Sequence, residues 1–353
     1  MLLKKEIMVE KKNYRAIDGL RAYSAIGIVL MHVLQNGGYD LEGFLFERVI
    51  LSFADLVFLF MIISGFGMCC GYYEQVISKN FDIRTFYGKR YFRVWPCFAV
   101  FCILDLMIAP SKNACYEVFA NLTLCFGLLP NARLSVIGVG YFLGVLFVFY
   151  LLFPYFCYLL SSKRRAWVSF GCALVFNRLC TIYFNAGRSN FVYCAVFFLV
   201  GGIIFLYKGQ LTEIAQKHHW MIWFLCIGVT AIYYSVRANV YVLVVLFCAM
   251  LVYAIGVQKN GILQNKVTKF LSEISMEIYL AHMVVYRVLE KMKLIHLFTS
   301  ELISYVVTAI GTLIGVVVFA VILKYALQKV NEIGHCLPDI CSKVRNKEWL
   351  KRN

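Results

Sequence analysis

The sequence predicts an all-α membrane protein, a polytopic bundle of about ten transmembrane helices with one short re-entrant or interfacial segment. Of its 353 residues, 61% are hydrophobic and 15% are charged, and the mean hydropathy is +0.74. That composition is far more apolar than that of a soluble domain. Apolar runs of about 18 residues or more, the length that crosses hydrocarbon as a helix, recur along the chain. They are continuous instead of alternating, which favours helices over a β-barrel.

The apolar runs, taken in order, define the expected spans. They are residues 17–35, 50–70, 92–109, 141–160, 166–184, 191–207, 219–236, 238–257, 271–290 and 300–323. A shorter run at 117–129 contains Asn121 and precedes Pro130. Its length of about 13 residues is typical of a re-entrant or interfacial segment.

The distribution of lysine and arginine predicts the orientation. If the 117–129 run does not cross, the basic clusters fall on one side of the membrane, at 4–15, 79–93, 163–165, 208–217, 259–269 and 324–352. The positive-inside rule assigns that side to the cytosol. We therefore expect a multi-pass protein of the cell membrane with both termini cytosolic. Its parts are a basic N-terminus (1–16), one membrane domain (17–323) and a basic tail (324–353).

Charge and cysteine usage exclude other classes of protein. The net charge of +16 comes from basic clusters between apolar runs, so the lipid bilayer is the expected partner and nucleic acid is not. The 14 cysteines lie mostly inside apolar runs without CxxC spacing, which is typical of small buried hydrophobic residues. We expect neither disulfides nor a metal site.

Arg21 and His32 are ionisable residues inside the first expected span, where lipid tolerates charge poorly. Eleven helical steps separate them, which is only about 20° more than three full turns and a rise of about 16 Å. Both side chains are therefore predicted to lie on one stripe, with Asp18 able to pair with Arg21 on the same face. The alternatives are a snorkelling arginine and a histidine that only bonds a neighbouring helix.

His32 is the candidate catalytic base, because a neutral imidazole can take a proton from a hydroxyl at neutral pH. Asp55, at a similar depth in the second span, is a candidate partner for its other ring nitrogen, or else part of a separate structural ion pair. His282 in the ninth span is a second catalytic candidate, and its neighbours Ser275 and Tyr279 make that span unusually polar.

The segment before the third span reads RTFYGKRYFRVWP and contains Lys89, Arg90 and Arg93. Arg90 and Arg93 fall on one helical face, and Pro96 is expected near the helix start. A basic helix N-terminus binds phosphate well, so these residues are candidates for binding coenzyme A. An ordinary positive-inside anchor is the alternative.

Five segments together resemble the acyltransferase 3 family of membrane acyltransferases, which O-acylate surface glycans. They are YRAIDGLRAYSAIGIVLMH, VFLFMIISGF, FYGKRYFRVWP, YFLGVLFVFYLLFP and SEISMEIYLAH. They occur in the family's order and span most of the chain. The chain departs from many relatives at Phe58, where an Asp or Pro is common, and in GVLFVFY, where larger relatives carry a Glu pair.

The resemblance implies an O-acyltransferase that moves an acyl group, expected to be acetyl, from acyl-CoA to a glycan acceptor. It implies that Arg21 and His32 are the family's essential pair, with His32 as base or acyl relay. It also places Arg21, Arg90 and Arg93 around the acyl donor, acetyl-CoA. The rivals are a transporter or flippase for a glycan or amphiphile, and a membrane partner without catalytic activity.

Overall fold

The computed structural model describes residues 14–108, 110–128, 140–236, 239–257 and 261–349. Every regular element in these ranges is helical. The α-helices are α1 (Ala16–Gly37), α2 (Leu56–Ile77), α3 (Ile83–Ile108), α4 (Lys112–Leu122), α5 (Tyr141–Leu159), α6 (Lys163–Tyr183), α7 (Phe191–Leu206), α8 (Lys208–Lys217), α9 (His219–Ser235), α10 (Val240–Gly256), α11 (Lys266–Glu273), α12 (Ser275–Lys291) and α13 (Glu301–Trp349). Two short helices of other types, η1 (Leu45–Ile50) and η2 (Phe53–Asp55), precede α2. A third, η3 (Phe126–Leu128), follows α4.

The described residues contain five helices that are long and apolar enough to cross a membrane, or six if the bent pair of α7 and α8 is counted as one. Each of the ten expected spans is helical over most of its length, although 50–70 includes the turn η2 and 271–290 covers the end of α11 and most of α12 with a break at Ile274. The ends at 109 and 238 lie outside the described residues. The helices α9 and α10 are apolar but have 17 residues each. At 1.5 Å per residue they reach about 25 Å, short of roughly 30 Å of hydrocarbon. Ten crossings therefore remain a prediction.

The basic segment before the third span folds differently from the sequence-based expectation. The helix α3 begins at Ile83 and continues through Pro96, so Arg90 and Arg93 lie inside it. The prediction that a helix starts near Pro96 and presents its N-terminus to phosphate is wrong. The physical reason is that Asp82 caps the helix at an earlier position. Its carboxylate accepts hydrogen bonds from the backbone N–H groups of Arg84 and Thr85, as an N-cap residue does.

The described part of the short apolar run, residues 117–128, forms the end of α4 and the single turn η3, and residue 129 lies outside the described residues. With 11 residues, α4 is about 16 Å long and so is too short to cross the hydrocarbon. Its first turn is capped by Ser111, which accepts a hydrogen bond from the Ala114 N–H at 3.0 Å. The helix packs along α3, because Tyr91 and Trp95 both donate to the carbonyl of Leu122 at 2.9 Å.

The centre of the bundle is built on a close approach of α2 and α7. A side-chain carbon added at Gly65 would lie 2.4 Å from the Phe198 carbonyl oxygen, and one at Gly201 would lie 2.1 Å from the Ile62 carbonyl oxygen. Small residues let helix backbones approach in this way, which gains dispersion energy where lipid supplies no hydrophobic driving force. Phe58 and Phe197 stack beside this contact with centroids 4.2 Å apart.

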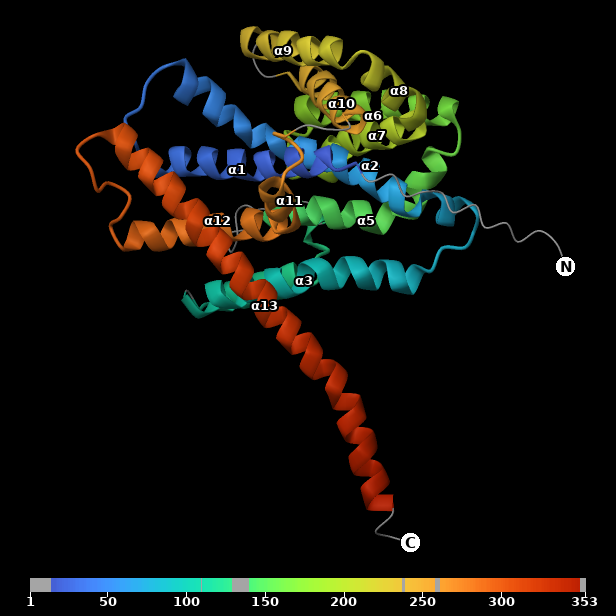
Figure 1. Ribbon diagram of the computed structural model, residues 1–353, viewed down its shortest axis with the longest axis vertical. Helices are drawn as coiled ribbons and strands as arrows, with labels where there is room; N and C mark the ends of the chain where they lie inside the picture. The colour runs from blue at the N-terminus through green and yellow to red at the C-terminus, as the bar shows by residue number, and fades with distance from the viewer. Residues whose placement is uncertain (1–13, 109, 129–139, 237–238, 258–260, 350–353) are drawn as a thin grey trace, which may run out of the picture.

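Peripheral helices expose large apolar side chains, as expected where the solvent is lipid. In the most apolar 18-residue stretch of α6, only 22% of the residues are buried, against 67% in that of α5. The helix α9 lies at one edge of the bundle and α3 near the opposite edge, whereas α1, α2 and α5 lie between them (Figure 1). The helix α13 continues past residue 323 without a break and runs out beyond the bundle.

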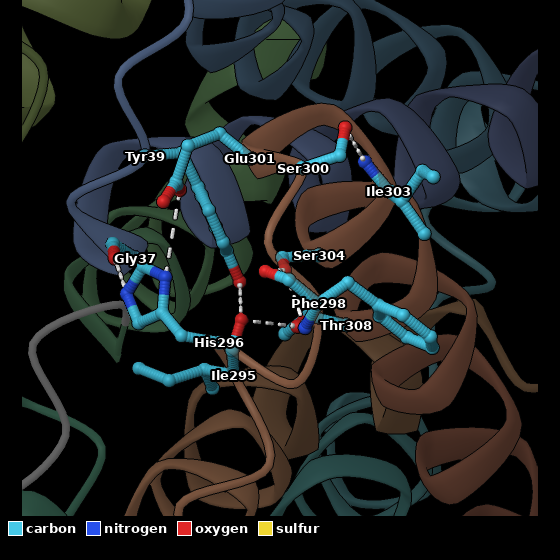
Figure 2. Close-up of polar contacts among 10 residues, drawn as sticks. All are labelled: Gly37, Tyr39, Ile295, His296, Phe298, Ser300, Glu301, Ile303, Ser304 and Thr308. Carbon is cyan, nitrogen blue, oxygen red and sulfur yellow. Dashed lines mark hydrogen bonds and ion pairs between the residues drawn. The ribbon is translucent and has the colours of Figure 1, made fainter.

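The end of α1 is fastened to the loop between α12 and α13 (Figure 2). His296 contacts the Gly37 carbonyl oxygen at 2.9 Å through Nε2 and the Glu301 carboxylate at 3.5 Å through Nδ1. Tyr39 packs on the His296 ring and donates to the Ile295 carbonyl at 3.0 Å. These contacts fix the C-terminal end of α1, the helix that carries both Arg21 and His32.

Candidate functional site

A cavity of about 250 Å³ lies between α1, α2, α3, α5 and α12. Its wall combines cations, hydroxyl groups and apolar side chains. The lining residues are Arg21, Phe60, Ser64, Gly67, Met68, Arg90, Arg93, Phe142, Leu143, Leu146, Tyr150, Ser275, Met276 and Tyr279. The sequence segments with family-like motifs thus meet around one enclosed space.

Three arginines face this cavity without a carboxylate partner. Among the described residues, the ion pairs are Arg188 with Asp55, His296 with Glu301 and Lys324 with Glu273, so Arg21, Arg90 and Arg93 are in none of them. Like charges gathered in a partly desolvated space are costly unless an anion joins them. The cavity is therefore suited to an anionic ligand.

Arg90 is held in an aromatic cage. Its guanidinium donates to the Tyr72 hydroxyl at 2.7 Å and lies 5.1 Å from the Tyr72 ring centroid and 5.9 Å from that of Tyr150. Cation–π contacts of this kind stabilise a desolvated cation. The Arg90 Nε atom is buried and has no hydrogen-bond partner among the described residues, which leaves a donor for a bound group.

Arg21 approaches the cavity from α1. Its guanidinium lies beside Gly67 of α2, where a side-chain carbon would be in ordinary van der Waals contact at 3.8 Å. Asp18, expected beside Arg21, accepts a hydrogen bond from Ser272 at 2.9 Å instead of forming one of the ion pairs. Arg93 is exposed and lines the same space, so the cavity opens at Arg93.

The other end of α1 brings the two candidate histidines together. The rings of His32 and His282 lie with centroids 4.9 Å apart. His282 is completely buried, contacts the Ile278 carbonyl at 3.3 Å through Nδ1, and has no hydrogen-bond partner for Nε2 among the described residues. Its ring is 6.0 Å from Tyr279, which lines the cavity.

A polar stripe of α12 connects the cavity with the histidines. Ser275, Tyr279 and His282 follow at spacings of four and three residues, which places them on one helical face. Ser275 and Tyr279 line the cavity, and His282 lies one turn beyond. Together with α1, this stripe makes one polar line from Arg21 to His32.

Asp55 contacts residues other than His32. Its carboxylate accepts from the Arg188 guanidinium at 3.3 Å and from the Tyr233 hydroxyl at 2.6 Å. Although Asp55 precedes α2, it makes no capping hydrogen bond to that helix. Of the two alternatives for Asp55, the geometry favours the ion pair over orientation of the His32 ring.

Arg188, in the loop between α6 and α7, is a functional candidate that no sequence motif marks. It lies two residues before Asn190, whose side chain caps α7 by accepting from Val192 and Tyr193. Burial would lower the pKa of Arg188, but Tyr141 and Asp55 raise it, and the net shift is upward. Arg188 therefore carries a fixed positive charge beside Asp55.

The remaining predicted residue, Lys89, is exposed and is not among the cavity-lining residues. Tyr150 and Tyr72 were missed, because a tyrosine in an apolar run carries no sequence signal of its cation partner. Among the described residues, no group of three or more His, Cys, Asp or Glu side chains is placed to hold a metal ion.

A family model described as an acyltransferase domain, that of acyltransferase 3, matches residues 14–325. This region contains α1 to α12 and the first half of α13, and therefore the whole cavity and both histidines. No curated protein and no solved structure matches the chain.

Proposed function

Since the chain belongs to the acyltransferase 3 family, we propose that it is a membrane-bound O-acyltransferase that moves an acyl group, acetyl in the first instance, from acyl-CoA to a hydroxyl of a cell-surface or lipid-linked glycan. One observation carries the proposal. A cavity with three arginines outside any ion pair is joined by Tyr279 to a pair of histidines. The arginines thus provide a binding place for an anionic acyl donor, and the histidines next to it provide a proton acceptor.

The arginines are assigned to the phosphates of coenzyme A. Guanidinium groups bind phosphate by paired, charge-assisted hydrogen bonds. The cavity of about 250 Å³ is smaller than the roughly 300 to 1,000 Å³ of sites that enclose a whole drug-sized ligand. It therefore takes the slender pantetheine arm and its thioester, while the nucleotide end stays at the open side near Arg93.

His32 is assigned to proton transfer. It takes the proton of the acceptor hydroxyl as the oxygen attacks the thioester carbonyl, a new C–O ester bond forms and the C–S bond breaks. The proton then passes from the imidazole to the departing thiolate of coenzyme A, so that the products are the acyl ester and the free thiol. Transfer through an acyl group on His32 itself is the alternative route.

His282 is assigned to holding the His32 ring. Its Nδ1 atom faces the Ile278 carbonyl, which fits a proton on Nδ1 and an acceptor lone pair on Nε2. The His282 ring packs against the His32 ring with centroids 4.9 Å apart, and this contact keeps the His32 ring in one orientation, as second groups do in catalytic dyads. The polar face of α12 is the element that carries this support.

The proposal is tested with the purified full-length protein, acetyl-CoA labelled in the acetyl group, and cell-envelope glycan from the cells that express the chain. Label is expected in the glycan as an alkali-labile ester, with one free coenzyme A thiol released per ester. His32→Ala is expected to abolish both. Glycan movement across vesicles without ester formation would support a flippase and overturn the proposal.

A further inference from the structure

A second polar cluster lies at the outer end of the bundle, away from the cavity arginines. Asp55 comes from the turn before α2, Arg188 from the α6–α7 loop, Tyr141 from the start of α5 and Tyr233 from α9. Arg188 contacts Asp55 and the Tyr141 side chain, and Tyr233 donates to Asp55. Four segments that are distant in sequence thus converge on one charged pair.

Arg188 keeps binding capacity in this arrangement. A guanidinium has five N–H donors, and those of Arg188 contact the Ala54 carbonyl at 3.4 Å, Asp55 at 3.3 Å and Tyr141. Among the described residues, these contacts use three of the five donors and leave two without a partner. The Arg188 side chain is 43% exposed, whereas that of Asp55 is 13% exposed, so the free donors are reached from outside.

The cluster adjoins the far end of the cavity. The Tyr141 hydroxyl is within hydrogen-bonding reach of Tyr279, which lines the cavity and packs near His282. Phe142, the residue after Tyr141, lines the cavity too. A molecule bound at Arg188 is therefore separated from the histidines by only two tyrosines.

Chain direction places this cluster opposite the donor arginines. On α1, Arg21 comes first and His32 last, while α2 runs back from Asp55 to Gly67 beside Arg21. On α5, Tyr141 contacts Arg188 and Tyr150 contacts Arg90. Arg90 and Arg93 thus line the donor side of the cavity, and Arg188 and Asp55 lie beyond its opposite side, next to Phe142 of the lining.

We propose that Arg188, Asp55 and Tyr141 form the binding subsite for the hydroxyl-bearing glycan acceptor. A guanidinium, a carboxylate and a phenol offer hydrogen-bond donors and acceptors side by side, which is what adjacent sugar hydroxyls require, since each hydroxyl both donates and accepts. Phe58, beneath the Arg188 guanidinium at 5.8 Å from its ring centroid, holds the cation in place. The assignment rests on the proposed acyl transfer and names the end from which its acceptor enters.

The test separates the acceptor from the donor in steady-state kinetics of the purified protein. Labelled acetyl-CoA and cell-envelope glycan are varied in turn for the wild type, Arg188→Gln, Arg188→Lys and Tyr233→Phe. Arg188→Gln is expected to raise the KM for the glycan about tenfold and to leave the KM for acetyl-CoA within twofold. Arg188→Lys keeps the charge but replaces the planar guanidinium with a single ammonium group. Its KM for the glycan is expected to lie between those of the wild type and Arg188→Gln.

Controls distinguish binding from folding and from general charge. Lys291→Gln removes an exposed cation at the end of α12 and is expected to leave both KM values unchanged. Tyr233→Phe keeps the ion pair and is expected to raise the glycan KM only about twofold. An unchanged glycan KM in Arg188→Gln, or an equal rise in both KM values, overturns the acceptor subsite, whereas a wild type that forms no ester overturns the acyl transfer itself.

Discussion

The imidazole rings of His32 and His282 lie against one another across the contact of α1 and α12, with centroids 4.9 Å apart and planes inclined by 37°. The two residues are 250 positions apart in the sequence, and each is the only histidine of its helix among the described residues. Their contact brings the first and the last of the family-like motifs together. It also places the proposed base beside His282, whose ring lies 6.0 Å from that of Tyr279 at the cavity wall.

We predict that His32→Ala lowers acyl transfer by a hundredfold or more, since a positioned base contributes about 10²- to 10⁴-fold to a rate. His282→Phe is expected to lower kcat by about tenfold, because it keeps a ring packed on His32 but removes the polar imidazole nitrogens. Release of coenzyme A thiol measures both. His219→Phe, at an exposed histidine at the start of α9, is the control, and a fully active His32→Ala variant contradicts the role of the base.

Tyr72→Phe is predicted to raise the KM for acetyl-CoA about tenfold without changing kcat. The substitution keeps the ring of the cage and removes only the hydroxyl that accepts from Arg90 at 2.7 Å. A hydrogen bond made by a charged group contributes about 1.5 to 3 kcal/mol, and the lower value corresponds to about that factor. Arg90→Gln is expected to have a larger effect in the same direction. Tyr158→Phe, at an exposed tyrosine of α5, should match the wild type.

Gly201→Leu is predicted to destabilise the bundle strongly. The new side chain would meet the Ile62 carbonyl and the Phe66 backbone nitrogen, which are parts of α2 that cannot move independently. Overpacking against side chains costs about 1 to 3 kcal/mol, and contact with backbone costs more. Thermal unfolding in detergent checks this, with Gly228→Leu as the matched control, because nothing lies within 4 Å at that position of α9. Equal unfolding temperatures for the two variants would disprove the packing argument.

His296→Phe is predicted to lower the free energy of unfolding by about 1 to 3 kcal/mol, the cost of leaving a carbonyl such as that of Gly37 without its hydrogen bond. Both ring nitrogens of His296 face oxygen atoms, of Gly37 and of Glu301. The variant is compared with Glu301→Gln, which keeps the bond to Gly37 and should cost less. Chemical denaturation of both variants provides the measurement, and a larger loss in Glu301→Gln would refute the assignment.

Local periodicity predicted the helices well and their boundaries less well. The run from Phe92 was taken as the start of a span, yet α3 begins nine residues earlier at Ile83. Basic residues reduce hydropathy without reducing helix formation, and hydropathy was the signal used. The number of crossings depends on where the edge of the hydrocarbon layer lies along α9 and α10. A pattern of apolar residues does not define that position.

The pairing of charges was beyond the reach of sequence spacing. Asp18 lies one helical turn from Arg21, yet it bonds Ser272 of α11. Asp55 and Arg188 are 133 residues apart and form an ion pair through a turn and a loop. Helix geometry predicts which residues share a face, but it does not predict which other helix that face meets.

The sequence by itself determined that the chain is helical and apolar, that Arg21 and His32 share one stripe, and that basic residues precede the third span. These properties follow from short-range geometry, which the order of residues encodes directly. Only the tertiary structure decided that His282 meets His32, that Tyr72 and Tyr150 enclose Arg90, and that Arg188 pairs with Asp55. Those contacts depend on which helices pack together, and side-chain packing between distant segments fixes that choice.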